Sequence, residues 1–148
     1  MEGDKGEVTF NQAKLQQIRI DARFIEIDRL SVNMFTYNDL YHTDNYNVIF
    51  QGLVDIFLTI SYNLNPEERK ELDDKRKATR NILRNNPPFR THKLLSNNNY
   101  PVTNFNTKNM DIINDALFDY RMLIEGMLGK YGFSNPTKQD ASRSAVKF

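Results

Sequence analysis

The feature that most restricts the fold of this chain is a stripe of apolar residues near its C-terminal end. Its members recur at the three- and four-residue spacing of one helix face, namely Ile113, Ala116, Leu117, Tyr120, Leu123, Ile124, Met127 and Tyr131. This spacing predicts an amphipathic helix that buries its apolar face against other elements. Gly132 follows where a left-handed residue can end the helix, and Phe133 is then placed to contact Leu128.

A second long helix is predicted over residues 10–34. Neither Gly nor Pro occurs between Glu7 and Gln51, and Thr9 with Gln12 forms a capping-box pattern. The apolar residues of this segment fall in two stripes on opposite sides, one of Leu15, Ile18, Ala22 and Ile25, the other of Ile20, Phe24, Ile27 and Met34. A helix that is apolar on two sides requires two neighbours, and one of them can be a second chain.

The same segment has an alternative interpretation as a β-strand. Residues 18–24 alternate between apolar and polar, and residues 25–28 alternate in the opposite phase. A strand over residues 18–34 would make the fold α+β. The helix is favoured because so long a strand would contain a phase slip without any turn residue.

Two further helices complete the predicted bundle. Residues 46–63 are apolar nearly all round, which is typical of a helix at the centre of a bundle. Asn65 and Pro66 give a strong start signal for a mostly polar helix that runs to about Arg84. The predicted fold class is therefore all-α, an irregular bundle of about four helices in a single domain over residues 1–133.

Two segments are not expected to join the core of this bundle. Residues 85–108 form a long extended arm, rich in Asn and Pro, and connections of this length are usually functional or ordered by a partner. Residues 134–148 lack hydrophobic periodicity and are predicted to be a flexible C-terminal tail. Val146 and Phe148 at its end could anchor the tail on a partner.

Positive charge is concentrated on and around the arm. No acidic residue occurs between Asp74 and Asp111, although the formal net charge of the whole chain is only +1. Guanidinium groups suit phosphate oxygens, and aromatic rings stack on bases. The candidate contacts for a partner or a nucleic acid are Arg76, Arg80, Arg84, Phe89, Arg90, Lys93, Tyr100 and Phe105. Alternatively, the arginines pair with Asp111, Asp115 and Asp119 inside the bundle.

Residues that could carry out catalysis are scarce. The chain has no Cys, and His42 with Asp39 and Asp44 matches no spacing of a known metal site. We therefore expect no catalytic residue, no metal, no cofactor and no small-molecule substrate, and a metal-dependent enzyme is the least favoured function. The apolar run at 46–64 is interrupted by polar residues and no secretory signal opens the chain, so a cytoplasmic protein without a membrane span is expected.

These features lead to two functional hypotheses. The first is a non-catalytic structural subunit that assembles with copies of itself and with other proteins, through an oligomer interface of Ile20, Phe24, Ile27, Ile113, Tyr120, Leu123 and Met127. The 18 Asn residues indicate an AT-rich genome, as many bacteriophages have, so a phage virion or its assembly apparatus is the expected setting. The second hypothesis is a small accessory protein that binds single-stranded nucleic acid through residues 75–108.

Overall fold

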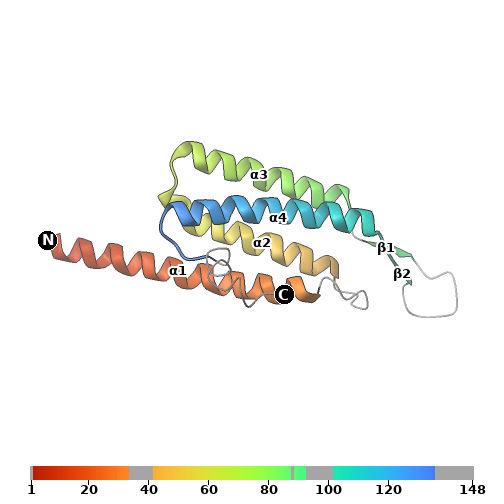
Figure 1. The fold of residues 1–148 in the computed structure, drawn as a ribbon, viewed down its shortest axis with the longest axis horizontal. Helices are drawn as coiled ribbons and strands as arrows, with labels where there is room; N and C mark the ends of the chain where they lie inside the picture. Colours follow the sequence, from red (N-terminus) through yellow and green to blue (C-terminus); the bar gives the residue numbers. More distant parts are fainter. Residues whose placement is uncertain (1, 34–41, 88, 93–101, 136–148) are drawn as a thin grey trace, which may run out of the picture.

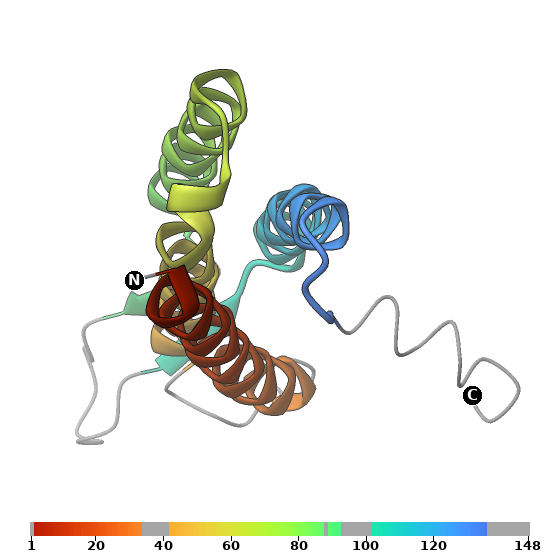
Figure 2. The same ribbon diagram turned by 90° about the vertical axis from the view of Figure 1, so that its left-hand side faces the viewer.

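The computed structural model describes residues 2–33, 42–87, 89–92 and 102–135. Within these ranges the fold is all-α, as the sequence predicts, with four helices: α1 (Glu2–Asn33), α2 (His42–Ile60), α3 (Pro66–Asn85) and α4 (Thr107–Lys130). The helices run side by side, and the N-terminal part of α1 projects beyond the other three (Figure 1). An end-on view shows α2 between α1 and α3, with α4 to one side (Figure 2).

The helix α1 is longer than its sequence pattern predicts. Residues 18–33 all lie within it, so the alternative of a strand in this segment is wrong. The helix begins at Glu2, which makes Thr9 an interior residue, and the predicted capping box at Thr9 and Gln12 is therefore also wrong. Once a helix is nucleated, each added residue gains a backbone hydrogen bond, so a local cap signal need not stop it.

The helix α2 is the centre of the bundle, as its all-round apolar pattern predicts, and it contacts each of the other three helices. Its buried apolar side chains are Tyr46, Ile49, Phe50, Leu53, Ile56, Phe57 and Ile60, and Thr59 is buried as well. It begins at His42, so residues 42–45 are helical, whereas the apolar pattern predicts the helix only from residue 46. A short 3-10 turn, Ser61–Asn63, then leads to α3.

A glycine allows α1 and α2 to approach closely. A Cβ atom added at Gly52 would lie 3.1 Å from both Cγ1 and Cδ1 of Ile27, which is tighter than ordinary van der Waals contact. Ile27 is itself buried in the core. Gly52 therefore sets the spacing of the two helices at this level, because any larger residue would push α1 outward.

The polar helix α3 is attached to α4 by a buried carboxylate. Asn65 and Glu68 form a capping box at the start of α3, in which each side chain accepts a hydrogen bond from the backbone N–H of the other. Glu68 also accepts hydrogen bonds from Nζ of Lys130 and from the hydroxyl of Tyr131, at the end of α4. These donors, Lys130 first, hold the pKa of Glu68 at about 2, far below its usual range.

The end of α4 has the predicted glycine cap. Gly132 has a φ of 83°, the N–H of Phe133 donates to the carbonyl of Leu128 at 2.9 Å, and the N–H of Gly132 donates to the carbonyl of Gly129. This is the Schellman pattern, and both Phe133 and Leu128 lie in the core. Asn135 is also buried, so the packed structure continues past residue 133.

The arm between α3 and α4 contains a small antiparallel ribbon at its base. Strand β1 (Phe89–His92) pairs with β2 (Val102–Phe105), with Phe89 opposite Phe105 and His92 opposite Val102. The arm is confirmed as the connection between the third and fourth helices, but the ribbon is not expected from the sequence. Each strand has only four residues, too few for a clear alternating pattern.

Candidate functional site

One face of α1 presents large apolar side chains to solvent. Leu15, Ile18 and Ile25 are 61%, 55% and 63% exposed, and Ala22 between them is exposed as well. We call these four residues the outer stripe. Ile20, Phe24 and Ile27 on the opposite face, which we call the inner stripe, are 0%, 4% and 1% exposed. The outer stripe is therefore a contiguous apolar surface, which on a folded protein commonly marks an interaction site.

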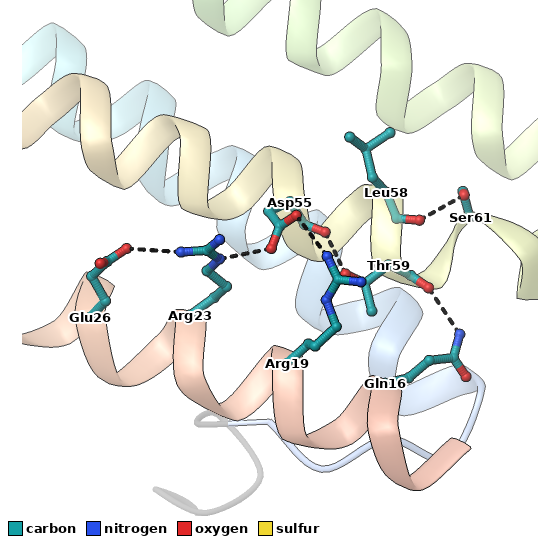
Figure 3. A network of polar contacts seen from close by, with 8 residues as sticks. All are labelled: Gln16, Arg19, Arg23, Glu26, Asp55, Leu58, Thr59 and Ser61. Carbon is teal, nitrogen blue, oxygen red and sulfur yellow. Dashed lines mark hydrogen bonds and ion pairs between the residues drawn. The ribbon is translucent and has the colours of Figure 1, made fainter. Parts of the chain in front are cut away.

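Polar contacts with α2 fix one edge of α1. Asp55 of α2 accepts from Arg23 at 2.7 Å and pairs with Arg19 at 3.5 Å, and Gln16 donates to the carbonyl of Thr59 at 2.9 Å (Figure 3). The hydrogen bond from Arg23 to Asp55 raises the pKa of that guanidinium above its ordinary value. This row of contacts sets the rotation of α1 about its own axis.

Contacts with α4 and its continuation fix the other edge of α1. Arg121 donates to Asp28 at 2.8 Å, and its guanidinium lies over the ring of Phe24, 5.1 Å from the centroid. Gln17 and Ser134 exchange two hydrogen bonds, because the Ser134 N–H donates to the Gln17 side chain and the Gln17 amide donates to the Ser134 carbonyl. With both edges held, the outer stripe points away from the bundle.

The sequence-predicted oligomer residues lie mostly inside a single chain. Ile113 and Tyr120 of α4 are buried with the three inner-stripe residues, and Leu123 and Met127 are half-buried against the same core. The hydroxyl of Tyr120 is buried without a hydrogen-bond partner among the described residues, and its burial raises the pKa of the phenol. The apolar surface that α1 leaves uncovered among the described residues is therefore the outer stripe.

The three candidate arginines of α3, Arg76, Arg80 and Arg84, lie in two different environments. Arg76 is largely covered and is neutralised by Asp73 of its own helix, at 2.8 Å. Arg80 and Arg84 are exposed, and neither has an ion-pair partner among the described residues. The alternative pairing with Asp111, Asp115 or Asp119 does not occur in the described part of the chain.

Arg80 and Arg84 instead face α2 across a groove. The groove has a volume of about 430 Å³ and is lined by Asn47, Phe50, Gln51, Arg80, Leu83 and Arg84. The sequence pattern did not single out Asn47 and Gln51. The signal that could have identified them is two amides spaced four residues apart on a helix that is otherwise apolar.

Several predicted contacts lie outside the residues whose side chains are described. Phe89, Arg90 and Phe105 are placed only as backbone in the ribbon, and Lys93, Tyr100, Val146 and Phe148 lie outside the described residues. His42 and Asp44 are in the first turn of α2, and Asp39 lies outside the described ranges. Across the part of the chain that is described, no cluster of three His, Asp or Glu side chains could hold a metal ion.

Two further findings concern possible classes of protein. No helix in the described ranges has both the length and the apolar character needed to span a membrane. In comparisons with protein-family models, curated proteins and solved structures, the chain gave no significant match. Its function is therefore inferred from the surfaces of the molecule.

Proposed function

We propose that this protein is a non-catalytic structural subunit whose copies associate through the outer stripe of α1. The observation that carries the proposal is the exposure of Leu15, Ile18 and Ile25 on a helix whose two edges are fixed by polar contacts. Burying such side chains typically stabilises by roughly 1.5–3 kcal/mol each when they become fully covered. A partner that covers this stripe therefore has a substantial driving force.

The spacing of the outer stripe supports a second copy of the same chain as that partner. Leu15, Ile18, Ala22 and Ile25 follow one another at the alternating three- and four-residue intervals of a coiled-coil seam. In a parallel pair, the charges beside the seam would place Lys14 against Arg19 and Asp21 against Glu26 of the second copy. Like charges at these positions oppose association.

An antiparallel pair removes those two repulsive contacts. It faces Leu15 with Ile25 and Ile18 with Ala22, and it places Lys14 beside Asp28 of the second copy. Two like-charge contacts remain at its centre, Arg19 with Arg19 and Asp21 with Asp21. Their repulsion is reduced within each chain, because Arg19 pairs with Asp55 and Asp21 accepts a hydrogen bond from Gln17. The proposed assembly contact is therefore an antiparallel pair of α1 helices.

Analytical ultracentrifugation tests the association. We expect the wild-type chain to form at least dimers at roughly tens of micromolar, by mass action. The double substitution Ile18→Asp and Ile25→Asp should give monomers with an unchanged helical circular dichroism spectrum. The matched control is Leu58→Asp on α2, which changes an apolar residue of similar exposure (55%) outside the stripe. A wild-type monomer throughout this range would overturn the proposal.

Disulfide cross-linking tests the direction of the pair, since the chain has no native Cys. A mixture of Leu15→Cys and Ile25→Cys chains should cross-link on mild oxidation, whereas neither variant alone should. In the antiparallel pair two copies of residue 15 lie about 15 Å apart, beyond the reach of a disulfide. Efficient cross-linking of Leu15→Cys with itself would instead identify a parallel pair.

The setting we propose for this subunit is a bacteriophage virion or its assembly apparatus, where it would also contact other protein subunits. The support for the setting is composition alone, namely the abundance of Asn and other residues with AT-rich codons. Mass spectrometry of purified virions from a host that carries the gene tests it. Absence of the protein from both virions and assembly intermediates would contradict it.

A second candidate function is binding of single-stranded nucleic acid through residues 75–108. The observation that favours it is the presence of two neighbouring arginines, Arg80 and Arg84, that are exposed and without an ion-pair partner among the described residues. Fluorescence anisotropy with a labelled single-stranded oligonucleotide at low salt tests it. Affinity should fall steeply as salt is added, because phosphate contacts release counterions.

A further inference from the structure

The groove between α2 and α3 has the donors of an anion-binding site on both walls. Arg80 and Arg84 lie one helical turn apart on α3, and Asn47 and Gln51 lie one turn apart on α2. All four side chains can donate hydrogen bonds, and none of the described residues that line the groove is a carboxylate. The chemistry of the walls therefore selects an acceptor-rich, negatively charged ligand.

Two apolar side chains also line the groove. Phe50 is buried and packs against Tyr120, with ring centroids 6.0 Å apart, and Leu83 is half-buried beside it. Apolar side chains beside two arginines and two amides suit a ligand that alternates charged groups with less polar ones, as a sugar–phosphate chain does.

We infer that this groove binds the phosphodiester backbone of a single-stranded nucleic acid, an inference that rests on the second candidate function above. The guanidinium groups of Arg80 and Arg84 contact successive phosphates, since forked donors match phosphate oxygens. The amides of Asn47 and Gln51 donate to the same strand from the opposite wall. The sequence alone predicts contacts with nucleic acid on α3 and the arm. The groove adds Asn47 and Gln51 of α2 to these contacts.

The position of the groove favours a nucleic acid over an acidic peptide. The helix α3 ends one residue after Arg84 and leads directly into the ribbon, where Phe89 and Phe105 occupy paired positions. The groove therefore lies at the end of α3 from which the chain continues to these two positions. Aromatic residues next to a cationic groove are typical of single-strand binding surfaces, because bases stack on them.

The main test compares two pairs of charge reversals on the same helix. Arg80→Glu with Arg84→Glu should weaken binding of a labelled oligothymidylate by more than about tenfold at low salt. It should also lower the slope of log affinity against log salt by about 1.4, for two lost phosphate contacts. Arg69→Glu with Lys70→Glu changes the net charge equally, but both residues are exposed on α3 before residue 75 and do not line the groove. This control should keep affinity within about threefold.

A neutral pair of substitutions separates a shaped groove from general electrostatic attraction. Asn47→Ala with Gln51→Ala leaves the charge unchanged and should weaken oligothymidylate binding about threefold to tenfold, without altering the salt slope. Competition with pyrophosphate distinguishes a nucleic-acid strand from a small free phosphate compound as the ligand. It should displace the oligonucleotide only at far higher concentration than an unlabelled strand does.

The possible outcomes distinguish failure of the proposed groove from failure of the nucleic-acid-binding function. Oligonucleotide binding that is unaffected by the Arg80 and Arg84 reversals overturns the groove but leaves the nucleic-acid function standing. Equal loss in the Arg69 and Lys70 control overturns the groove as a defined site. No binding of the wild-type chain at low salt overturns both, and displacement by equimolar pyrophosphate identifies a small phosphate ligand instead of a strand.

Discussion

The two stripes of α1 are similar in composition and opposite in environment. The inner stripe of Ile20, Phe24 and Ile27 is buried against α2 and α4, whereas Leu15, Ile18 and Ile25 of the outer stripe are each more than half exposed. The difference arises because α1 lies at the margin of the bundle and packs mainly against one helix, α2. An apolar stripe therefore indicates that a helix has a neighbour on that side, but not whether the neighbour belongs to the same chain.

The largest expected effect comes from comparing alanine substitutions at two adjacent residues, one in each stripe. Phe24→Ala should lower the free energy of unfolding by about 3–5 kcal/mol, because it opens a cavity in the core. It also removes the ring beneath Arg121. Ile25→Ala, measured at a concentration too low for association, should change it by no more than about 0.5 kcal/mol. Denaturation in urea measures both, and equal losses would show that the outer stripe is covered within one chain.

A second test concerns the close approach of α1 and α2. Gly52→Val should lower the free energy of unfolding by about 1–3 kcal/mol, because the new side chain meets Ile27 and forces the helices apart. Gly126→Val on α4 is the matched control, since nothing lies within 4 Å of a Cβ atom there. Thermal unfolding followed by circular dichroism separates the two. If Gly52→Val left the free energy of unfolding unchanged, the inner stripe could shift without a cost in stability.

A smaller effect is expected at the polar edge of α1. Asp55→Asn weakens the contacts with Arg19 and Arg23, and should lower the free energy of unfolding by at most about 1 kcal/mol, because both arginines are substantially exposed. The loss should shrink in high salt, which screens the wild-type pairs. Glu26→Gln, which affects only the weaker contact with Arg23, serves as the control. A loss above 3 kcal/mol would make this edge, and not the inner stripe, the main attachment of α1.

The last test concerns the contact between α3 and α4. Unlike the apolar faces of α1, this contact depends on a charged carboxylate, so its contribution to stability should depend on pH. The folded-state pKa of Glu68 is about 2, below its ordinary value of 4.5, so its contribution is fully present above pH 4.5 and is lost as the pH falls toward 2. The melting temperature of the wild type should therefore decline more steeply over this range than that of Glu68→Gln. Parallel declines would show that the contacts of Glu68 with Lys130 and Tyr131 add no acid-sensitive stability.

Much of the fold was predictable because its signals are local. The caps at Asn65 and Gly132 depend on a few neighbouring residues, and both ends form as the sequence predicts. The start of α1 at Glu2 and the ribbon at the base of the arm were not predictable in the same way. A helix can extend past a cap signal, and strands of four residues are stabilised by pairing more than by their own pattern.

The candidate sites were predictable only in part. The basic character of residues 75–108 can be read from the sequence, but the separation of Arg76 from Arg80 and Arg84 depends on where Asp73 and α2 lie. Asn47 and Gln51 come from a different helix, and only packing brings them to the same groove. Contacts between distant segments are set by the joint shape of several helices, which no single segment encodes.

Periodicity alone was sufficient to show that α1 has two apolar faces, because each face repeats within a few turns. Which face is buried depended on the packed chain. Gly52 brings α2 close to Ile27, while Asp55 and Arg121 hold the two edges of α1, and together these contacts turn the inner stripe toward the core. The outer stripe keeps its apolar surface because this chain has no further helix among its described residues to place over it.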